Sequence, residues 1–313
     1  MMTTGLSNKR MIQDLGSFAS GGVIEGESLS RYTTYRVGGE AELFVVASSS
    51  DEAAGVFRYA KRAGVPLTLL GAGSNVIPPD DGIEGIVLQL RHETAAVEFL
   101  ENGNVLADAG FNIVDLARVC ARRGLQGLTS IAGVPGSVGG AVLMNAKVVR
   151  EETGALLEKV EVLTSTGRRR VFKRGEMSFG YRSSMFQGAG MLILRAEFRL
   201  EPGDPETIIR DVEDEWKQWR SRFPLDPPNA GSVFKRPEGD YAGRLIEEAG
   251  CKGLTIGGAR VSEDHANFIH NIGGATAADI LGLIDLVRER VLEKTGVCLE
   301  LEQIPLPVRP QDR

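Results

Sequence analysis

The chain has 313 residues and a mass of 33.7 kDa, which is enough for two domains or one large one. Hydrophobic residues make up 42% of it and charged residues 25%, which excludes a disordered, collagenous or membrane-spanning chain. A net charge of −6 offers no overall basic field to nucleic acid or to an anionic membrane surface. The N-terminus lacks the apolar stretch of a secretory signal, and no run of about 18 apolar residues occurs, so we expect a cytoplasmic protein without membrane insertion.

Short β-rich runs alternate with helical stretches over the first 200 residues. Strands are predicted at 42–47, 66–71, 85–90, 104–110, 159–167, 169–174 and 191–200. Helices are predicted at 51–64 and 112–124, and the second has an apolar face that ends at a glycine. These elements indicate a mixed α and β architecture.

A longer helix is predicted at 206–223, where Ile208, Val212, Trp216 and Trp219 share one face. The helix ends at a proline cluster at 223–228, and the turn-rich segment 201–204 precedes it. We therefore predict a domain boundary at 201–204 and a separate C-terminal domain at 201–313.

Glycine is the residue whose abundance departs most from the average, since 39 of 313 residues are about 12%, against a usual value near 7%. A first cluster follows a predicted buried strand, at Gly71-Ala72-Gly73-Ser74-Asn75. Small residues at this place leave backbone N–H groups open to a phosphate, and Ser74 and Asn75 add side-chain donors. A tight turn between a strand and a loop is the alternative reading of this cluster.

A second cluster holds four glycines within eight residues, at Gly133, Gly136, Gly139 and Gly140. No acidic or bulky residue interrupts it, so it forms a surface for a flat or phosphorylated ligand. Two such stretches about 60 residues apart favour an extended ligand with a pyrophosphate, for which FAD is the obvious candidate. Composition does not choose FAD over another nucleotide.

Seven segments, in this order, resemble the UDP-N-acetylenolpyruvoylglucosamine reductase (MurB) family. The resemblance is to its shorter second subtype, because no long extra loop with a substrate-clamping tyrosine stands between Tyr181 and Ser232. The segments are LLGAGSNVI, AGVPGSVGGAVLMNA, FGYRSS, PNAGSVFK, LIEEAGCKG, VSEDHANFIHN and GVCLELE, and the match runs from about Tyr32 to Glu302. The resemblance implies an α+β fold with a two-lobed FAD-binding domain at 21–200, followed by a smaller substrate-binding domain at 201–313. The lobes are expected at about 21–88 and 89–200, after an N-terminal extension at 1–20.

The resemblance also implies a reaction, in which NADPH reduces FAD and the enolpyruvyl group of a UDP-sugar is then reduced to give UDP-N-acetylmuramic acid. The cofactor is expected to be non-covalent, because the first glycine stretch contains no His or Cys. The residues expected to contact it are Gly71, Ala72, Gly73, Ser74, Asn75, Val76, Pro135, Gly136, Ser137, Gly139 and Gly140.

Three residues match the catalytic positions of the family. Arg182 is expected to stabilise the enolate, because a guanidinium stays charged and binds a carboxylate with two bonds. Ser232 is expected to donate a proton to C2, with Lys235 or water assisting, and Glu302 to lie beside the enolate. Without the resemblance, Arg182 would be interpreted as a surface residue and Ser232 as part of a loop. Side chains in a strand alternate between its two faces, so Glu300 and Glu302 would face the same side and could not be told apart.

Substrate contacts are expected from Tyr181, Asn229, Lys235 and Arg236. Two positions depart from the family pattern. Arg236 stands where an asparagine is usual, and 147–150 reads Lys-Val-Val-Arg where glycine is usual, so a loop near the flavin is bulkier. No metal site is expected from His92, His265 and His270, and Cys120, Cys251 and Cys298 are read as reduced thiols.

Two other functions remain open. One is a different FAD oxidoreductase of the same two-lobed class, such as an alcohol or sugar oxidase, although the C-terminal motifs oppose it. The other is a non-catalytic flavin-binding or UDP-sugar-binding relative, although all three chemical residues are retained. The sequence fixes neither the choice of NADPH over NADH nor the oligomeric state.

Overall fold

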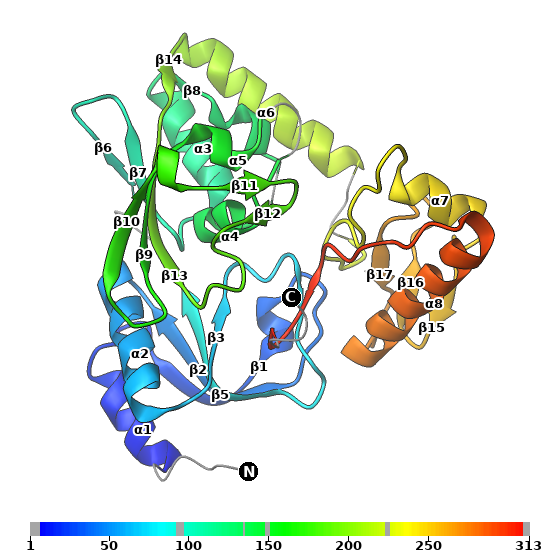
Figure 1. Ribbon diagram of the computed structural model, residues 1–313, viewed down its shortest axis with the longest axis horizontal. Helices are drawn as coiled ribbons and strands as arrows, with labels where there is room; N and C mark the ends of the chain where they lie inside the picture. The colour runs from blue at the N-terminus through cyan, green and yellow to red at the C-terminus, as the bar shows by residue number, and fades with distance from the viewer. Residues whose placement is uncertain (1–6, 92–96, 134, 148–150, 223–225, 309–313) are drawn as a thin grey trace.

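The computed structural model describes residues 7–91, 97–133, 135–147, 151–222 and 226–308. Two sheets with their helices form the larger part of the molecule, and a smaller unit lies beside them (Figure 1). The last strand runs from the smaller unit back to the first lobe, so the two parts are joined twice along the chain (Figure 1). None of the described helices is long and apolar enough to cross a bilayer.

The first lobe is a four-stranded sheet in the order β1-β2-β5-β3. Strands β2 and β3 run parallel to β5, and β1 is antiparallel to β2. The elements of this lobe are α1 (Asn8–Gly16), β1 (Val23–Ser28), η1 (Leu29–Tyr32), β2 (Glu40–Ala47), α2 (Ser50–Ala63), β3 (Leu67–Leu70), β4 (Val76–Ile77) and β5 (Ile83–Leu90). Helix α2 begins where the Ser49 side chain accepts a hydrogen bond from the N–H of Glu52, and it ends at the left-handed Gly64.

The second lobe is an antiparallel sheet in the order β10-β9-β13-β7-β6. Its strands are β6 (Val97–Phe99), β7 (Val105–Asp108), β8 (Leu125–Gln126), β9 (Leu157–Leu163), β10 (Arg169–Lys173), β11 (Phe179–Gly180), β12 (Ser183–Ser184), β13 (Leu192–Phe198) and β14 (Glu201–Pro202). Its helices are α3 (Ile113–Arg122), η2 (Leu128–Ile131), α4 (Val138–Leu143), α5 (Thr153–Leu156) and η3 (Arg174–Glu176). The side chains of both lobes pack into one continuous core.

The smaller unit is built on a three-stranded sheet covered by two helices. Its elements are α7 (Ala242–Glu248), β15 (Thr255–Ile256), β16 (Ala259–Val261), β17 (Ile269–Asn271) and α8 (Ala277–Thr295), and β18 (Ile304–Pro305) pairs with β4 of the first lobe. The N-terminus of α8 is also tied to the first lobe, because the Asp80 carboxylate accepts hydrogen bonds from the N–H groups of Ala277 and Ala278 at 2.7 and 2.9 Å.

The predicted strands and helices are confirmed to within a few residues at their ends, including the helix α6 (Pro205–Arg222). The predicted boundary at 201–204 needs correction, because α6 packs on α3 and buries Ile208 and Val212 in the core of the two lobes. Arg118 of α3 also pairs with Glu213 of α6 at 2.8 Å. The smaller unit therefore begins after α6.

Two sets of residues near the N-terminus belong to a different domain from the one that the predicted domain bounds give them. Helix α1 buries Met11 and Leu15 in the common core, so residues 8–16 of the predicted extension belong to the first domain. Tyr35, Val37 and Ile77 belong instead to the core of the smaller unit. The two parts of the molecule are thus built from interleaved pieces of chain.

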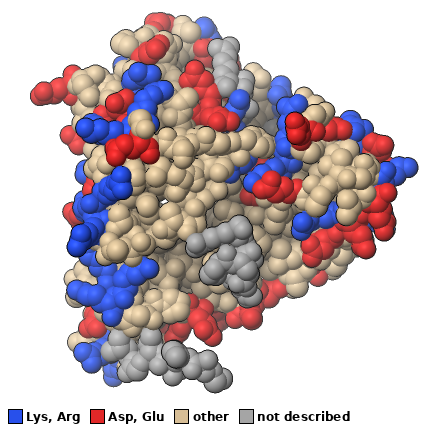
Figure 2. All heavy atoms as spheres, viewed as in Figure 1, with Lys and Arg blue, Asp and Glu red and all other residues tan. Residues whose placement is uncertain are grey.

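Charges of both signs are mixed over the face seen in Figure 2. Lys and Arg gather along one edge, where β10 and α2 lie (Figure 2). Several of these cations are paired, since Arg169 contacts Asp51 and Glu161, and Arg170 lies 3.3 Å from Glu176. The charges of Arg169 and Arg170 on this edge are therefore partly compensated by surface ion pairs.

Candidate active site

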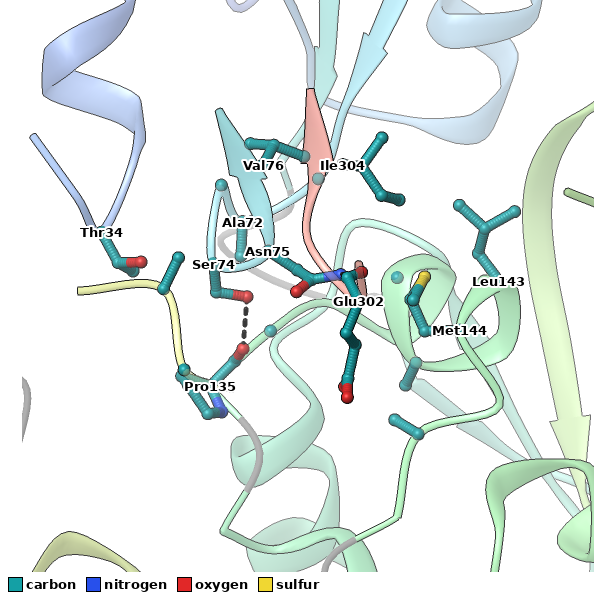
Figure 3. A pocket seen from close by; sticks show the side chains of 18 of the residues that line it. Thr34, Ala72, Ser74, Asn75, Val76, Pro135, Leu143, Met144, Glu302 and Ile304 are labelled. Carbon is teal, nitrogen blue, oxygen red and sulfur yellow. Dashed lines mark hydrogen bonds between the residues drawn. The ribbon is translucent and has the colours of Figure 1, made fainter. Parts of the chain in front are cut away.

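A cavity of about 410 Å³ opens between the two lobes and the smaller unit, and both glycine clusters line it (Figure 3). The first cluster contributes all of its predicted cofactor residues, from Gly71 to Val76. From Ala72 to Asn75, no backbone N–H donates a hydrogen bond to any described residue. These unpartnered donors beside small side chains are the chemistry of an anion site.

Gly73 has a structural reason to be glycine. Its φ is +67°, and a Cβ at this position would lie 1.8 Å from the carbonyl oxygen of Tyr32. The next residue joins the two clusters, because the Ser74 hydroxyl donates to the carbonyl of Pro135 at 2.5 Å, the bond drawn in Figure 3. The two glycine stretches therefore lie next to each other in the lining of one cavity.

The second cluster contributes Pro135, Gly136, Ser137 and Gly140 to the cavity. Ser137 caps the short helix α4, where its hydroxyl accepts from the N–H of Gly140 at 3.2 Å. Gly139 does not line this cavity, its N–H donates to the Ala109 carbonyl at 2.8 Å, and a Cβ there would lie 3.0 Å from the Ala109 Cβ, so its cofactor contact stays a prediction. Gly139 therefore packs on the turn after β7.

Gly133 also serves packing in this cluster. A Cβ on Gly133 would lie 2.7 Å from the side chain of Trp219, so glycine lets the end of α6 close over the cavity. Trp219 itself lines the cavity. The density of glycines in this stretch thus has two causes, and only one of them is the cavity surface.

A second cavity of about 470 Å³ continues from the first, and the two share Thr34, Gly71, Ala72, Gly136 and Ser137. Arg31 and Arg91 line this second part. The two cavities together form an elongated space with small residues at its middle and cations toward one end. This shape and donor set fit an extended dinucleotide with a central pyrophosphate.

A third cavity of about 430 Å³ lies on the other side of the first. The first and third cavities share three residues, and these are Arg182, Ser232 and Glu302. The three predicted catalytic side chains therefore lie together where the two cavities meet. In the sequence, Arg182 and Glu302 are 120 residues apart. A group bound in the first cavity and a molecule bound in the third would meet at these residues.

Arg182 and Glu302 form an ion pair across the domains, with Arg182 Nε 2.8 Å from Glu302 Oε1. The approach of Nε lacks hydrogen-bond geometry, so the contact is an ion pair by distance. Arg182 sits at the tip of the β11–β12 hairpin with φ of +52°, and its Nη1 donates to the carbonyl of Lys147 at 3.3 Å. The guanidinium is thus held in place by a left-handed turn that few non-glycine residues adopt.

The side chain of Glu302 reaches into the first cavity near Met144 (Figure 3). It is 12% exposed, and burial raises its pKa while Arg182 and Lys235 act in the opposite direction. The side chain of Glu300 is 72% exposed and contacts Lys235 Nζ. The two glutamates that alternation leaves equivalent are therefore different in the structure.

Ser232 lies in a loop that is fixed on both sides. The N–H of Gly231 donates to Asn229 Oδ1 at 3.1 Å before it, and Asn267 exchanges side-chain hydrogen bonds with the Phe234 backbone after it. Asn229 lines the first cavity, but it is fully buried and its amide also donates to Pro227 at 3.0 Å. Its amide therefore supports the serine loop, and a substrate contact of Asn229 stays a prediction.

Two of the other predicted substrate residues, Tyr181 and Arg236, line the third cavity. The N–H of Arg236 donates to the Tyr181 hydroxyl at 3.2 Å, and the Arg236 guanidinium lies 4.0 Å from the centre of the Tyr241 ring. Lys235 does not line the three cavities described above, and its Nζ points to Glu300. The predicted assistance of Lys235 to Ser232 is therefore not supported by this geometry.

Several lining residues are absent from the sequence predictions. Thr34 lies in both halves of the elongated space and has a buried hydroxyl without a hydrogen-bond partner among the described residues. Arg31, Arg91 and Tyr241 line the cavities as well. Thr34 begins the segment TYRVGG at 34–39, which resembles the start of a two-lobed FAD-binding domain and could have indicated it. The two arginines and Tyr241 lie in stretches with no distinguishing pattern.

The cysteines and histidines do not form a further centre among the described residues. No group of three or more His, Cys, Asp or Glu in this part of the chain is placed to hold a metal ion. Burial raises the pKa of the Cys120 thiol to about 12 and lowers the pKa of both His265 and His270. His92 lies outside the described residues.

Comparisons with known proteins agree with this arrangement. Residues 223–304 match the family "UDP-N-acetylenolpyruvoylglucosamine reductase, C-terminal domain", and residues 41–173 match an FAD binding domain. The chain is 45% identical over 280 residues to the UDP-N-acetylenolpyruvoylglucosamine reductase of Moorella thermoacetica, which covers 90% of this chain and 92% of the relative. The corresponding protein of Geobacillus kaustophilus is 41% identical over 280 residues, with 90% and 91% covered.

A solved structure is similar as well. The crystal structure of UDP-N-acetylenolpyruvylglucosamine reductase (MurB) from Thermus caldophilus matches with a TM-score of 0.76 and 35% identity, over 90% of this chain and 98% of that one. The expected α+β fold with an FAD-binding domain and a C-terminal domain is thereby confirmed.

Proposed function

The chain belongs to the family of UDP-N-acetylenolpyruvoylglucosamine reductases, and from this premise we propose that it reduces UDP-N-acetylglucosamine enolpyruvate to UDP-N-acetylmuramate. The reaction uses FAD and NADPH and supplies a precursor of peptidoglycan in the cytoplasm. The observation that carries the proposal is the meeting of two cavities at Arg182, Ser232 and Glu302.

The elongated space formed by the first and second cavities fits FAD. The N–H groups from Ala72 to Asn75 have no partner among the described residues and are suited to the pyrophosphate. The apolar side chains of Leu143 and Met144 line the half of the space near the catalytic residues. Held by these residues, FAD would supply the hydride-transfer chemistry between NADPH and C3 of the enolpyruvyl group.

Arg182 is proposed to bind the substrate carboxylate. Hydride addition to an α,β-unsaturated carboxylate moves negative charge onto that carboxylate, so a fixed cation beside it lowers the barrier. Arg182 lies at the junction of the cavities and its turn is held by the bond to Lys147, which keeps the charge in place before the reaction.

Ser232 is proposed to donate the proton that C2 receives. A serine hydroxyl is a weak acid, and the developing negative charge on the enolate beside it provides the driving force for the transfer. Glu302 is proposed to orient Arg182 through their 2.8 Å contact and to share a proton at the site, because burial raises its pKa. Ser232 and Glu302 come from opposite ends of the C-terminal domain sequence.

The third cavity is proposed to hold the UDP-sugar. Its wall carries the cations Arg236 and Arg244 and the exposed aromatic ring of Tyr241. Guanidinium groups suit a pyrophosphate, and an exposed ring offers a stacking surface to a base. Tyr181 and Arg236 both line this cavity and contact each other, so the second lobe and the C-terminal domain both take part in enclosing the substrate.

The spectrum of the purified protein tests the proposal. We expect bound oxidised flavin, bleaching of its absorbance by NADPH without oxygen, and recovery of the absorbance on addition of UDP-N-acetylglucosamine enolpyruvate. Reoxidation by oxygen alone, with no response to the UDP-sugar, would indicate an oxidase. Binding of the UDP-sugar without recovery of the flavin absorbance would indicate a non-catalytic relative.

A further inference from the structure

Tyr35 is a fully buried tyrosine that the proposed mechanism does not use. Its side chain is 0% exposed and packs in the core of the C-terminal unit, although the residue belongs to the N-terminal part of the chain. Its hydroxyl donates to Gln303 Oε1 at 3.1 Å, and its carbonyl accepts from Asn271 Nδ2 at 2.9 Å. Burial raises the pKa of Tyr35, so the phenol stays protonated and remains a donor.

The hydrogen bond from Tyr35 fixes the orientation of the Gln303 amide. Gln303 is 2% exposed, and its Nε2 donates to the carbonyls of Ala230 and Gly231 at 3.3 and 3.2 Å. Those carbonyls only accept, and the oxygen of the same amide is occupied by the tyrosine hydroxyl. A flipped amide would lose all three bonds, so one rotamer of the buried side chain is strongly preferred.

The carbonyl of Gly231 belongs to the peptide group that also carries the N–H of Ser232. Gln303 therefore holds the peptide plane on which the serine side chain is mounted. Gln303 follows Glu302 directly, and the N–H of Glu302 donates to the Val233 carbonyl at 2.8 Å. One short segment thus sets the position of both the serine and the glutamate.

We propose that Tyr35 and Gln303 are positioning residues for the proton transfer from Ser232. This inference rests on the proposed function and adds to it a buried hydrogen-bond relay from Tyr35 through Gln303 to the Gly231–Ser232 peptide. The relay touches neither the first nor the third cavity through its own side chains, since both residues are absent from the linings. Its effect is on the direction of the serine hydroxyl.

The test compares the two half-reactions in rapid-mixing experiments on the flavin-loaded protein. In Tyr35→Phe the ring is kept and the donor is removed, and in Gln303→Met the shape is kept and the amide is removed. We expect flavin reduction by NADPH to be unchanged and reoxidation by the enolpyruvyl substrate to slow by ~10-fold, since misplacement of a catalytic group by a fraction of an ångström has effects of this order. The solvent isotope effect on reoxidation should rise, because proton transfer becomes limiting.

Two further comparisons make the test specific. The double variant should be no slower than the slower single variant, because both changes break the same relay. Tyr59→Phe is the matched control, since its buried ring also donates a hydroxyl hydrogen bond, to Asp14 at 3.2 Å, at a place that lines none of the three cavities. Both of its half-reactions should match those of the wild type.

Unchanged reoxidation in both Tyr35→Phe and Gln303→Met would overturn the inference, and so would equal slowing of the two half-reactions. Slow reoxidation in Gln303→Met alone supports the relay if Tyr35→Phe is too unstable to bind flavin. A wild-type protein whose reduced flavin does not respond to the UDP-sugar would overturn the proposed function, and the inference with it.

Discussion

Ser232 is the residue whose replacement should separate the two half-reactions. In Ser232→Ala, reduction of the flavin by NADPH should be nearly unchanged, because the serine hydroxyl takes no part in it. Reoxidation by the enolpyruvyl substrate should slow by ~10² or more, the range for loss of a general acid. Rapid-mixing absorbance measures both rates. Ser221→Ala is a suitable control, because Ser221 is exposed on α6. Equal slowing of both half-reactions would remove Ser232 from the acid role.

Glu302 should make folding stability depend on pH in a defined direction. Burial raises its pKa in the folded protein, so the folded state holds a proton over a pH range in which the unfolded state has released it. Stability from this group is therefore present below the unfolded value, about 4.3, and is lost as pH rises through the raised folded value. Glutamine does not titrate, so Glu302→Gln should gain stability relative to wild type as pH rises through this window.

Urea unfolding at a series of pH values measures this difference. The same substitution at Glu300, whose side chain is 72% exposed, should change the pH dependence much less. A difference between Glu302→Gln and wild type that shrinks with rising pH would contradict the raised pKa. The variant should also lose substrate-driven reoxidation of the flavin, so stability and activity change in opposite directions at this residue.

At the residue scale, the sequence predicted which side chains lie together better than it predicted what each of them contacts. The three predicted catalytic residues were selected through their motifs, and the structure brings them together, whereas Lys235 was placed beside Ser232 only because it is three residues away. The structure turns Lys235 toward Glu300, because the chain is extended around Phe234 and pairs there with Leu301. Gln303 carried no motif at all, and its role depends on contacts with Tyr35, which is 268 residues away.

At the scale of elements, the backbone of the first glycine stretch predicts how much stability an alanine at Gly73 would cost. Gly73 and Gly64 have nearly the same left-handed φ, +67° and +65°, but a Cβ on Gly73 would overlap the Tyr32 carbonyl while one on Gly64 meets nothing within 4 Å. Gly64→Ala should cost about 1 kcal/mol for the conformation alone. Gly73→Ala should cost more than about 3 kcal/mol, because the loop must also move.

The comparison of the two glycine variants is made by urea unfolding of the apoprotein, together with the affinity for FAD from the quenching of flavin fluorescence. Gly73→Ala should weaken FAD binding and Gly64→Ala should leave it unchanged. Similar losses of stability in the two variants would mean that the loop at Gly73 relaxes without cost.

The apolar pattern of helix α6 predicts the helix but not the domain to which it belongs. The apolar face at Ile208, Val212, Trp216 and Trp219 predicts the helix and the side that is buried, and both are found. The pattern does not predict which core this face packs into. The turn at 201–204 and the proline cluster at 223–228 are equally good candidates for the domain boundary. Contact with α3 and with Gly133 decides in favour of the first domain.

At the scale of the whole molecule, the interleaving of the two cores explains how the three predicted catalytic residues are held in fixed relative positions. Arg182 belongs to the second lobe, while Ser232 and Glu302 belong to the C-terminal unit. The unit is tied to the first lobe by the β4–β18 pair and by Asp80 at the N-terminus of α8. These ties fix its orientation, so that the Arg182–Glu302 pair forms across the domains.

The same interleaving predicts that the C-terminal unit does not fold alone. Its core contains Tyr35, Val37 and Ile77, which lie 0%, 3% and 1% exposed in the full chain. A fragment of residues 226–313 lacks these side chains, and the loss of one large buried side chain typically costs 2 to 5 kcal/mol. Three such losses are comparable with the whole stability of a small domain, about 5 to 15 kcal/mol.

We therefore expect the fragment to show no cooperative unfolding in urea by circular dichroism, whereas the full chain does. Addition of residues 30–80 as a separate peptide should restore the transition, because it returns the missing core and β4. A cooperative transition in the fragment alone would show that the unit is an independent domain.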